Sequence, residues 1–152
     1  SFLVTHAGIT AEFWSSVLGG PTTAAEAASR INQLAKAGSG TVFRAGMYLH
    51  GKIMSDAGPL WADTTNELLP GWVDRRLPFS QIHGHNSVTS WRSPDIGAPR
   101  PGIEALITID HDAKHETVYL EGGRLIGVDP DHRDTPTAIW RSLEITGTVT
   151  AR

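Results

Sequence analysis

The order of strand-like and helix-like segments is the feature that most restricts what this chain can fold into. A short apolar run, "FLVT", predicts a buried strand, and the capping-box spacing of Thr23 and Glu26 predicts a helix that ends before Gly38. A second strand is predicted at "FSQIHG", and "EALITID" adds a third. The last strong pattern, "ETVYLEGGRLIGVD", predicts a hairpin about Gly122–Gly123. Early alternation of strands and helices followed by late strands predicts a layered α/β fold, a mixed sheet with a late antiparallel hairpin.

The segments between these patterns are less regular. Residues 10–20 predict a short helix capped by Thr10. Residues 41–54 fit either helix or strand, and residues 56–78 read mostly as loop. Residues 90–102 contain three prolines, so we expect a long loop or insertion there.

Composition excludes several classes of protein. With 39% hydrophobic and 19% charged residues, the chain belongs with globular domains. The net charge of −3 gives no electrostatic reason to expect nucleic acid or an anionic membrane as partner. No apolar run approaches the ~20 residues of a membrane span. The chain has no cysteine, which excludes disulfides and thiolate metal sites, and we expect a cytoplasmic protein.

Two of the seven histidines share one sequence context. His6 and His85 each follow an apolar strand pattern, with Gly8 or Gly84 close by. Strand ends hold side chains rigidly, and a small neighbour leaves room for an ion, so metal ligands often occur in this context. A single histidine there is more often a turn residue, and the shared context of two favours a metal site more than either alone. We expect His83, two residues before His85, to lie behind the metal ligands or to face solvent.

Four blocks of the sequence, in order, resemble the calcineurin-like metallophosphoesterases, which include bacterial Ser/Thr protein phosphatases and diadenosine-tetraphosphate hydrolases. "FLVTHAG" is similar to the family's late histidine block, and "GPLWAD" to the segment that often follows it. "QIHGHN" resembles the strand that ends in Gly-His, and "LITIDHD" with "VYLEGGRLIGVD" resembles the closing hairpin. The resemblance implies that residues 1–152 form a single domain or fragment, the C-terminal half of a four-layer α/β sandwich.

The resemblance also implies a function and a site. His6 and His85 correspond to ligands of one metal ion in a dinuclear centre of Mn, Fe or Zn, where two cations clamp phosphoryl oxygens and activate a water. The implied substrate is a phosphorylated protein or a small phosphoester, with dinucleoside polyphosphates as the alternative. Arg75 and Arg76 lie where protein phosphatases carry a phosphate-binding arginine, although a solvated loop pair is the interpretation that their setting favours.

The chain departs from the family at the other metal ligands. The motifs Gly-Asp-x-His, Gly-Asp-x-x-Asp-Arg-Gly and Gly-Asn-His-Glu/Asp do not occur in these 152 residues. They carry the bridging Asp and the general acid, which we expect upstream of Ser1, in an N-terminal half of the same domain. The chain would then hold half a site and be inactive alone. The alternative is a binding or scaffold module that keeps the fold without the chemistry.

Overall fold

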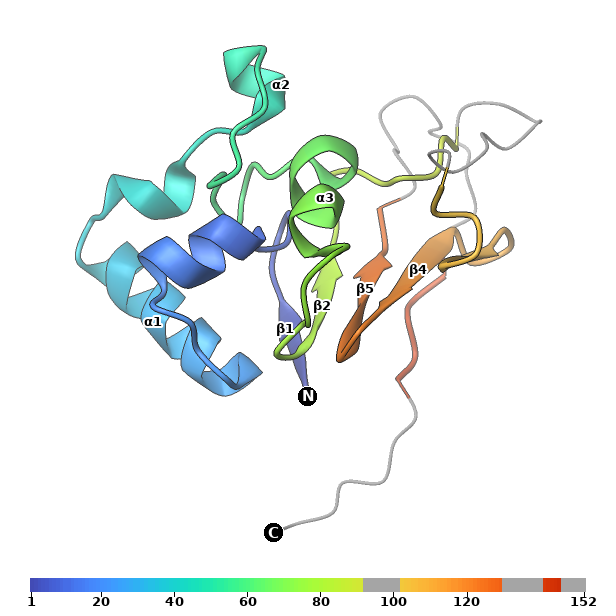
Figure 1. The fold of residues 1–152 in the computed structure, drawn as a ribbon, viewed down its shortest axis with the longest axis horizontal. Coiled ribbons are helices and arrows are strands. Elements are labelled where there is room, and N and C mark those ends of the chain that lie inside the picture. The colour runs from blue at the N-terminus through green and yellow to red at the C-terminus, as the bar shows by residue number, and fades with distance from the viewer. Residues whose placement is uncertain (92–101, 130–140, 146–152) are drawn as a thin grey trace, which may run out of the picture.

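A five-stranded mixed sheet forms the centre of the fold (Figure 1). The computed structural model describes residues 1–91, 102–129 and 141–145. The strands are β1 (Phe2–Val4), β2 (Ser80–His83), β3 (Ile107–Asp110), β4 (His115–Leu120) and β5 (Gly123–Gly127). They lie in the order β1-β2-β5-β4-β3, with β1, β2 and β5 parallel and the pairs β5-β4 and β4-β3 antiparallel. The predicted mixed sheet is confirmed, whereas the four-layer sandwich stays a prediction.

The late hairpin is confirmed, and its turn is fixed by one glycine. Leu120 pairs with Gly123, so Glu121 and Gly122 form the turn. Gly122 has φ +82°, and a Cβ there would lie 2.4 Å from the carbonyl oxygen of Leu77. Both the left-handed backbone and the close approach therefore require glycine.

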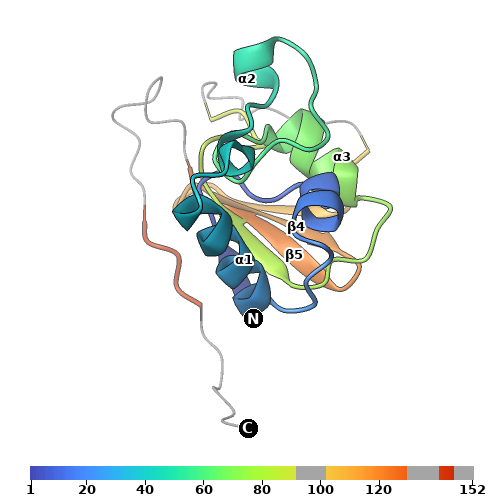
Figure 2. The same cartoon turned by 90° about the vertical axis from the view of Figure 1, so that its left-hand side faces the viewer.

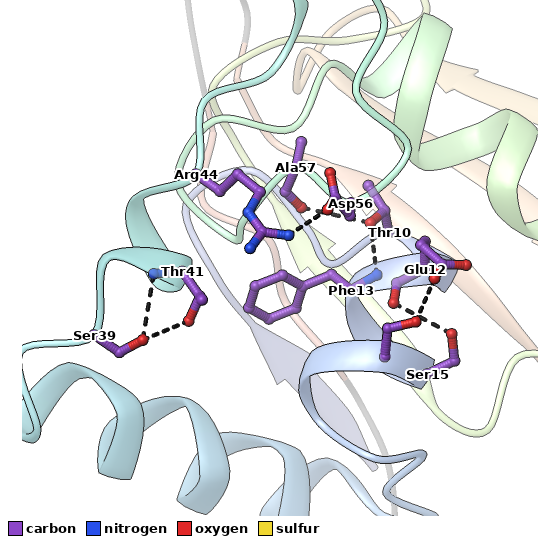
Figure 3. Close-up of polar contacts among 10 residues, drawn as sticks. Thr10, Glu12, Phe13, Ser15, Ser39, Thr41, Arg44, Asp56 and Ala57 are labelled. Carbon is purple, nitrogen blue, oxygen red and sulfur yellow. Dashed lines mark hydrogen bonds and ion pairs between the residues drawn. The ribbon is translucent and has the colours of Figure 1, made fainter.

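The first helical segments follow the sequence prediction. The hydroxyl of Thr10 accepts a hydrogen bond from the amide of Phe13 and starts the turn that continues into η1 (Phe13–Val17), as Figure 3 shows. The hydroxyl of Thr23 accepts a hydrogen bond from the amide of Glu26 at the start of α1 (Ala24–Lys36). These side chains satisfy amides that have no partner within the helix, which fixes where each helix begins.

The prediction that residues 56–78 are mostly loop is wrong at its centre. The π-helical η3 (Thr64–Leu68) is followed directly by α3 (Leu69–Trp72). The Asp63 carboxylate caps the start of η3 by accepting a hydrogen bond from the amide of Asn66. Pro70 and Gly71 are poor helix formers, but Pro70 lies in the first turn of α3, immediately after the π-helical η3, where proline is tolerated. Packing of the apolar face of this stretch outweighs the weak local propensity.

The core lies between one face of the sheet and the helices. In the register of the sheet, Leu3, Gln81, Leu125 and Val118 are neighbours across four strands and share a face, and all four are buried. Helical side chains cover that face. They include Phe13, Ala24, Ala27, Leu68, Leu69 and Trp72. Figure 2 shows α1 and α3 on the same side of the sheet.

Two polar groups in this core fasten the segment after β1. The side-chain amide of Gln81 accepts from the amide of Ile9 at 2.8 Å and donates to its carbonyl oxygen at 3.2 Å. The indole N–H of Trp72 donates to the same carbonyl at 2.8 Å. The chain from His6 to Ile9 is therefore held against the sheet by buried hydrogen bonds, each of which is costly to leave unmade.

The segment between α1 and η3 is irregular, but an ion pair and hydrogen bonds hold it in place. It contains η2 (Gly40–Phe43) and α2 (Met47–His50). Figure 3 shows the ion pair between Arg44 and Asp56 and the hydrogen bond from the Thr10 hydroxyl to the carbonyl oxygen of Ala57. Of the two structures expected for residues 41–54, the helix forms in part, as the end of η2 and the four-residue α2, and no strand forms in this described segment.

Two further expectations concern the chain's other segments. Of the predicted loop at 90–102, residues 92–101 lie outside the described residues. In the part of the chain that the structure describes, no helix is long and apolar enough to span a bilayer.

Candidate metal-binding site

His6 and His85, the two histidines singled out in the sequence, lie side by side beyond the carboxyl ends of β1 and β2. Hydrogen bonds continue the parallel pairing beyond β1 and β2, from the amide of Thr5 to the carbonyl oxygen of Ile82 (3.1 Å) and from the amide of Gly84 to that of His6 (2.8 Å). The ring centroids of His6 and His85 lie 5.0 Å apart, with an interplanar angle of 50°. Nitrogens that share one Zn²⁺ at about 2.0–2.1 Å lie roughly 3–4 Å apart, a distance that two imidazoles with this centroid separation can reach when a nitrogen of each ring faces the other. The predicted proximity is observed.

His85 adopts a backbone conformation that is uncommon for a residue with a side chain. Its φ is +68°, in the left-handed region. The next residue holds the turn in place, since the Asn86 side-chain oxygen accepts from the amide of Thr64 at 2.7 Å and the Thr64 hydroxyl donates to the carbonyl oxygen of Asn86 at 3.2 Å. Such strained residues persist where the surroundings fix them, and they cluster at functional sites.

The His85 ring is enclosed by other rings. Tyr48 and Trp61 meet it edge-on, with centroid distances of 5.7 and 5.5 Å. Its Nε2 atom is buried and has no hydrogen-bond partner within the described part of the chain. A buried polar atom without a partner costs about 1–3 kcal/mol, so this nitrogen suits a ligand that supplies the missing contact. Trp61, which the sequence analysis had not assigned to the site, therefore lines it.

Burial and neighbouring charge set the protonation of the site. Burial lowers the pKa of His85, and the neighbouring His6 lowers it further, while Asp129 and Asp63 oppose the shift. The neutral imidazole that results is the form that binds metal. His85 is therefore chemically suited to the role that the sequence resemblance implies.

His83 lies behind the histidine pair and not in solvent. It is 1% exposed, and its Nδ1–H donates to the carbonyl oxygen of Gly84 at 3.2 Å. Burial lowers its pKa to about 4, with a smaller contribution from His85 in the same direction. The expectation of a solvent-facing ring is wrong, because His83 lies on the face of the sheet that the helices cover.

Asp129 is the residue that the sequence analysis missed. It follows β5, the third parallel strand, whose pairing with β2 continues through the hydrogen bond from the amide of Val128 to the carbonyl oxygen of His83. A Cβ on Gly84 would lie 3.7 Å from Oδ2 of Asp129, which places this carboxylate next to the residue that precedes His85. Its position at the end of an apolar strand was the available signal, but its relevance required knowing that β5 pairs with β2.

The residues that the structure describes do not form a complete coordination sphere for a metal ion at this site. Among them, no group of three or more His, Cys, Asp or Glu side chains is arranged to hold an ion. The histidine pair fits a metal by ring spacing, by the neutral state of His85 and by its unpartnered Nε2.

The two arginines proposed to bind phosphate lie away from the histidines. Arg76 forms an exposed ion pair with Glu121 at 3.0 Å, at the turn before β5, and Arg75 is exposed beside it. The histidines lie beyond the other end of the same strands, since Gly127, the last residue of β5, pairs with His83. The structure therefore does not bring the arginines to this site.

Comparisons with known proteins identify no relative: no family model, no curated protein and no solved structure matches this chain significantly.

Proposed function

We propose that this chain contributes the histidine pair of a metal-dependent phosphoesterase, with His6 and His85 binding one divalent cation. The observation that supports the proposal best is their convergence. Two imidazoles with ring centroids 5.0 Å apart extend from the ends of adjacent parallel strands, and one has a buried Nε2 without a partner within the described part of the chain. Loops at the carboxyl ends of parallel strands are the usual place for the ligand sites of α/β proteins.

The chain's own residues would hold and insulate the ion. His6 and His85 supply nitrogen ligands, and the Asp129 and Asp63 carboxylates, which act on His85 through space, offset the positive charge. Tyr48 and Trp61 restrict water on two sides of the His85 ring. When bound in a dinuclear centre, Mn, Fe or Zn would polarise the phosphoryl group and lower the pKa of a bound water.

The remaining parts of the proposed centre rest on the sequence resemblance. The second metal's ligands, the bridging carboxylate and the general acid would come from the motifs that these 152 residues lack. The proposed substrate is a phosphorylated protein, with dinucleoside polyphosphates as the second choice. Arg75 and Arg76 have no part in this proposal, because their exposed position at the opposite end of the sheet keeps them from a phosphate held at the histidines.

A second function is a binding module that keeps the fold without the chemistry. One observation favours it: within the described residues, the histidine pair has no third ligand to complete a metal site. In that case the pair would bind a metal ion or another polar ligand weakly, and the protein would not turn over phosphoesters.

Metal titration of the protein separates these functions. Isothermal titration calorimetry with Mn²⁺ and Zn²⁺ should show binding that His6→Ala and His85→Ala each weaken at least about 100-fold. His50→Ala is the matched control, because His50 is exposed and its removal should leave the affinity unchanged. If His85→Ala binds metal as tightly as the wild type, the site is not a metal site. The second measurement is p-nitrophenyl phosphate hydrolysis by the full-length protein, where metal binding without turnover indicates the binding module.

A further inference from the structure

Residues 48–53 form a surface loop that is exposed throughout and contains three large apolar side chains. Tyr48 is 64% exposed, Leu49 is 60% and Ile53 is 59%. The described residues expose eight large hydrophobic side chains, and three of them fall within these six positions. Isolated apolar side chains on a surface are ordinary, but three within six consecutive positions form a local concentration that is a candidate for an interaction site.

The loop stands out from the body of the protein. Figures 1 and 2 both show α2, which carries Tyr48 and Leu49, projecting beyond the sheet and the other helices. Its turn depends on Gly51, which closes α2 with φ +66°. Tyr48 and Leu49 therefore belong to a segment of the backbone that projects from the body of the protein.

The base of the loop is fixed although its tip is exposed. One carboxylate oxygen of Glu67 accepts hydrogen bonds from the amides of Met47 and Met54, which bracket the loop, at 2.9 and 2.6 Å. Just outside them, Arg44 pairs with Asp56, and the amide of Gly58 donates to the carbonyl oxygen of Arg44. A loop that is already held in one conformation loses little entropy when it binds.

The charge on the loop has one sign. Residues 45–55 contain Lys52 and His50 but no acidic residue, although the whole chain has a net charge of −3. The net charge gave no reason to expect a membrane partner, but this local distribution does. A basic residue among exposed aliphatic and aromatic side chains is the composition of segments that enter the interface of an anionic bilayer.

The shape of the tip favours a lipid surface over a protein partner. Three side chains on a projecting loop present a few hundred Å² at most, whereas a stable protein interface buries roughly 800 Å² on each partner. A bilayer accepts a small projecting apolar tip without matching its shape. We propose that residues 48–53 dock this protein on an anionic lipid surface, with Leu49 and Ile53 inserted and Lys52 against the headgroup phosphates.

The docked orientation follows from the site's geometry. The Tyr48 ring lies 5.7 Å from that of His85, so the histidine pair is next to the loop. Docking would bring this pair close to the headgroups. The inference itself concerns binding, and it stands whether or not the pair holds a metal.

Vesicle sedimentation tests the inference. The protein is mixed with vesicles of phosphatidylcholine alone or of equal parts phosphatidylcholine and phosphatidylglycerol. We expect the anionic vesicles to bind at least about tenfold more protein, and 0.5 M salt to reduce this binding. The double variant L49D/I53D should lower the partition coefficient about tenfold or more, and K52E should reduce the preference for anionic lipid.

The control removes exposed apolar side chains elsewhere. Val73 (40% exposed) and Ile145 (45%) lie outside the loop, so V73D/I145D should bind vesicles like the wild type. Circular dichroism confirms that each variant is folded. The proposal is overturned if the wild type does not bind anionic vesicles, or if V73D/I145D weakens binding as much as L49D/I53D. It is also overturned if light scattering shows that L49D/I53D instead abolishes self-association of a protein that ignores vesicles.

Discussion

Glu67 should be the most costly polar side chain to remove, because it holds three backbone amides at once. It is 3% exposed, and its carboxylate accepts from the amides of Met47 (2.9 Å), Met54 (2.6 Å) and Asp63 (2.8 Å). These amides belong to the two ends of the exposed loop and to the cap of η3. One side chain thus connects the loop next to His85 with the helix that packs on the sheet.

The expected cost follows from those contacts. Hydrogen bonds to a charged group contribute about 1.5–3 kcal/mol each, and a buried amide left unpaired costs about 1–3 kcal/mol. The amides of Met47 and Met54 belong to half-buried residues and can turn to water, whereas that of Asp63 belongs to a buried one. Glu67→Ala should therefore lower the free energy of unfolding by about 3–5 kcal/mol. Glu67→Gln keeps one acceptor but turns an NH₂ group toward an amide, for a loss of about 1–3 kcal/mol.

Urea denaturation measures these losses, and hydrogen exchange locates them. In Glu67→Ala, hydrogen exchange should accelerate more at the amides of Met47 and Met54 than at the amides of β2. Glu121→Gln is the control, because Glu121 is exposed and its ion pair with Arg76 is worth at most about 1 kcal/mol. The reasoning is refuted if Glu67→Ala unfolds within about 1 kcal/mol of the wild type, or if loop and strand amides accelerate equally.

Three further predictions concern single side chains and the isolated chain. Gly127→Ala should destabilise the protein by about 1–3 kcal/mol in urea denaturation, because the new Cβ would lie 2.9 Å from Cγ of the buried Glu116; an unchanged urea midpoint would contradict this. Burial raises the pKa of Glu116, although the amides of Val88 and Thr89 oppose the shift; protonation is thus easier in the folded state. This group's contribution to stability is complete below the unfolded pKa near 4.5 and is lost as pH rises through the folded pKa. The urea midpoint of the wild type minus that of Glu116→Gln should therefore increase as the pH falls from 7 to 4.5. A difference that does not change with pH would contradict this prediction. Finally, residues 1–152 alone should hydrolyse p-nitrophenyl phosphate poorly even with Mn²⁺ or Zn²⁺, because within the described residues the histidine pair has no third ligand; robust turnover that His85→Ala abolishes would show that this chain forms a complete site.

The sequence alone determined the features that depend on neighbours along the chain. The capping box at Thr23 placed the start of α1, and the paired glycines at Gly122–Gly123 placed the hairpin turn within a residue. The shared context of His6 and His85 indicated one site, and their rings lie together. These predictions succeeded because caps, turns and strand ends are decided by short stretches of sequence. The prediction of mostly loop failed at residues 64–72, where burial of the helical face outweighed a weak local propensity.

Only the tertiary structure decided which strands meet, and with them the composition of the site. The pairing of β5 with β2 brings Asp129 to the histidines and leaves Arg76 at the far end of the sheet. The contacts of Tyr48 and Trp61 with His85 likewise join segments that no spacing rule relates. The physical reason is that strand order and side-chain contact between distant segments depend on how the whole core packs, whereas hydrophobic periodicity records only which face of each element is buried.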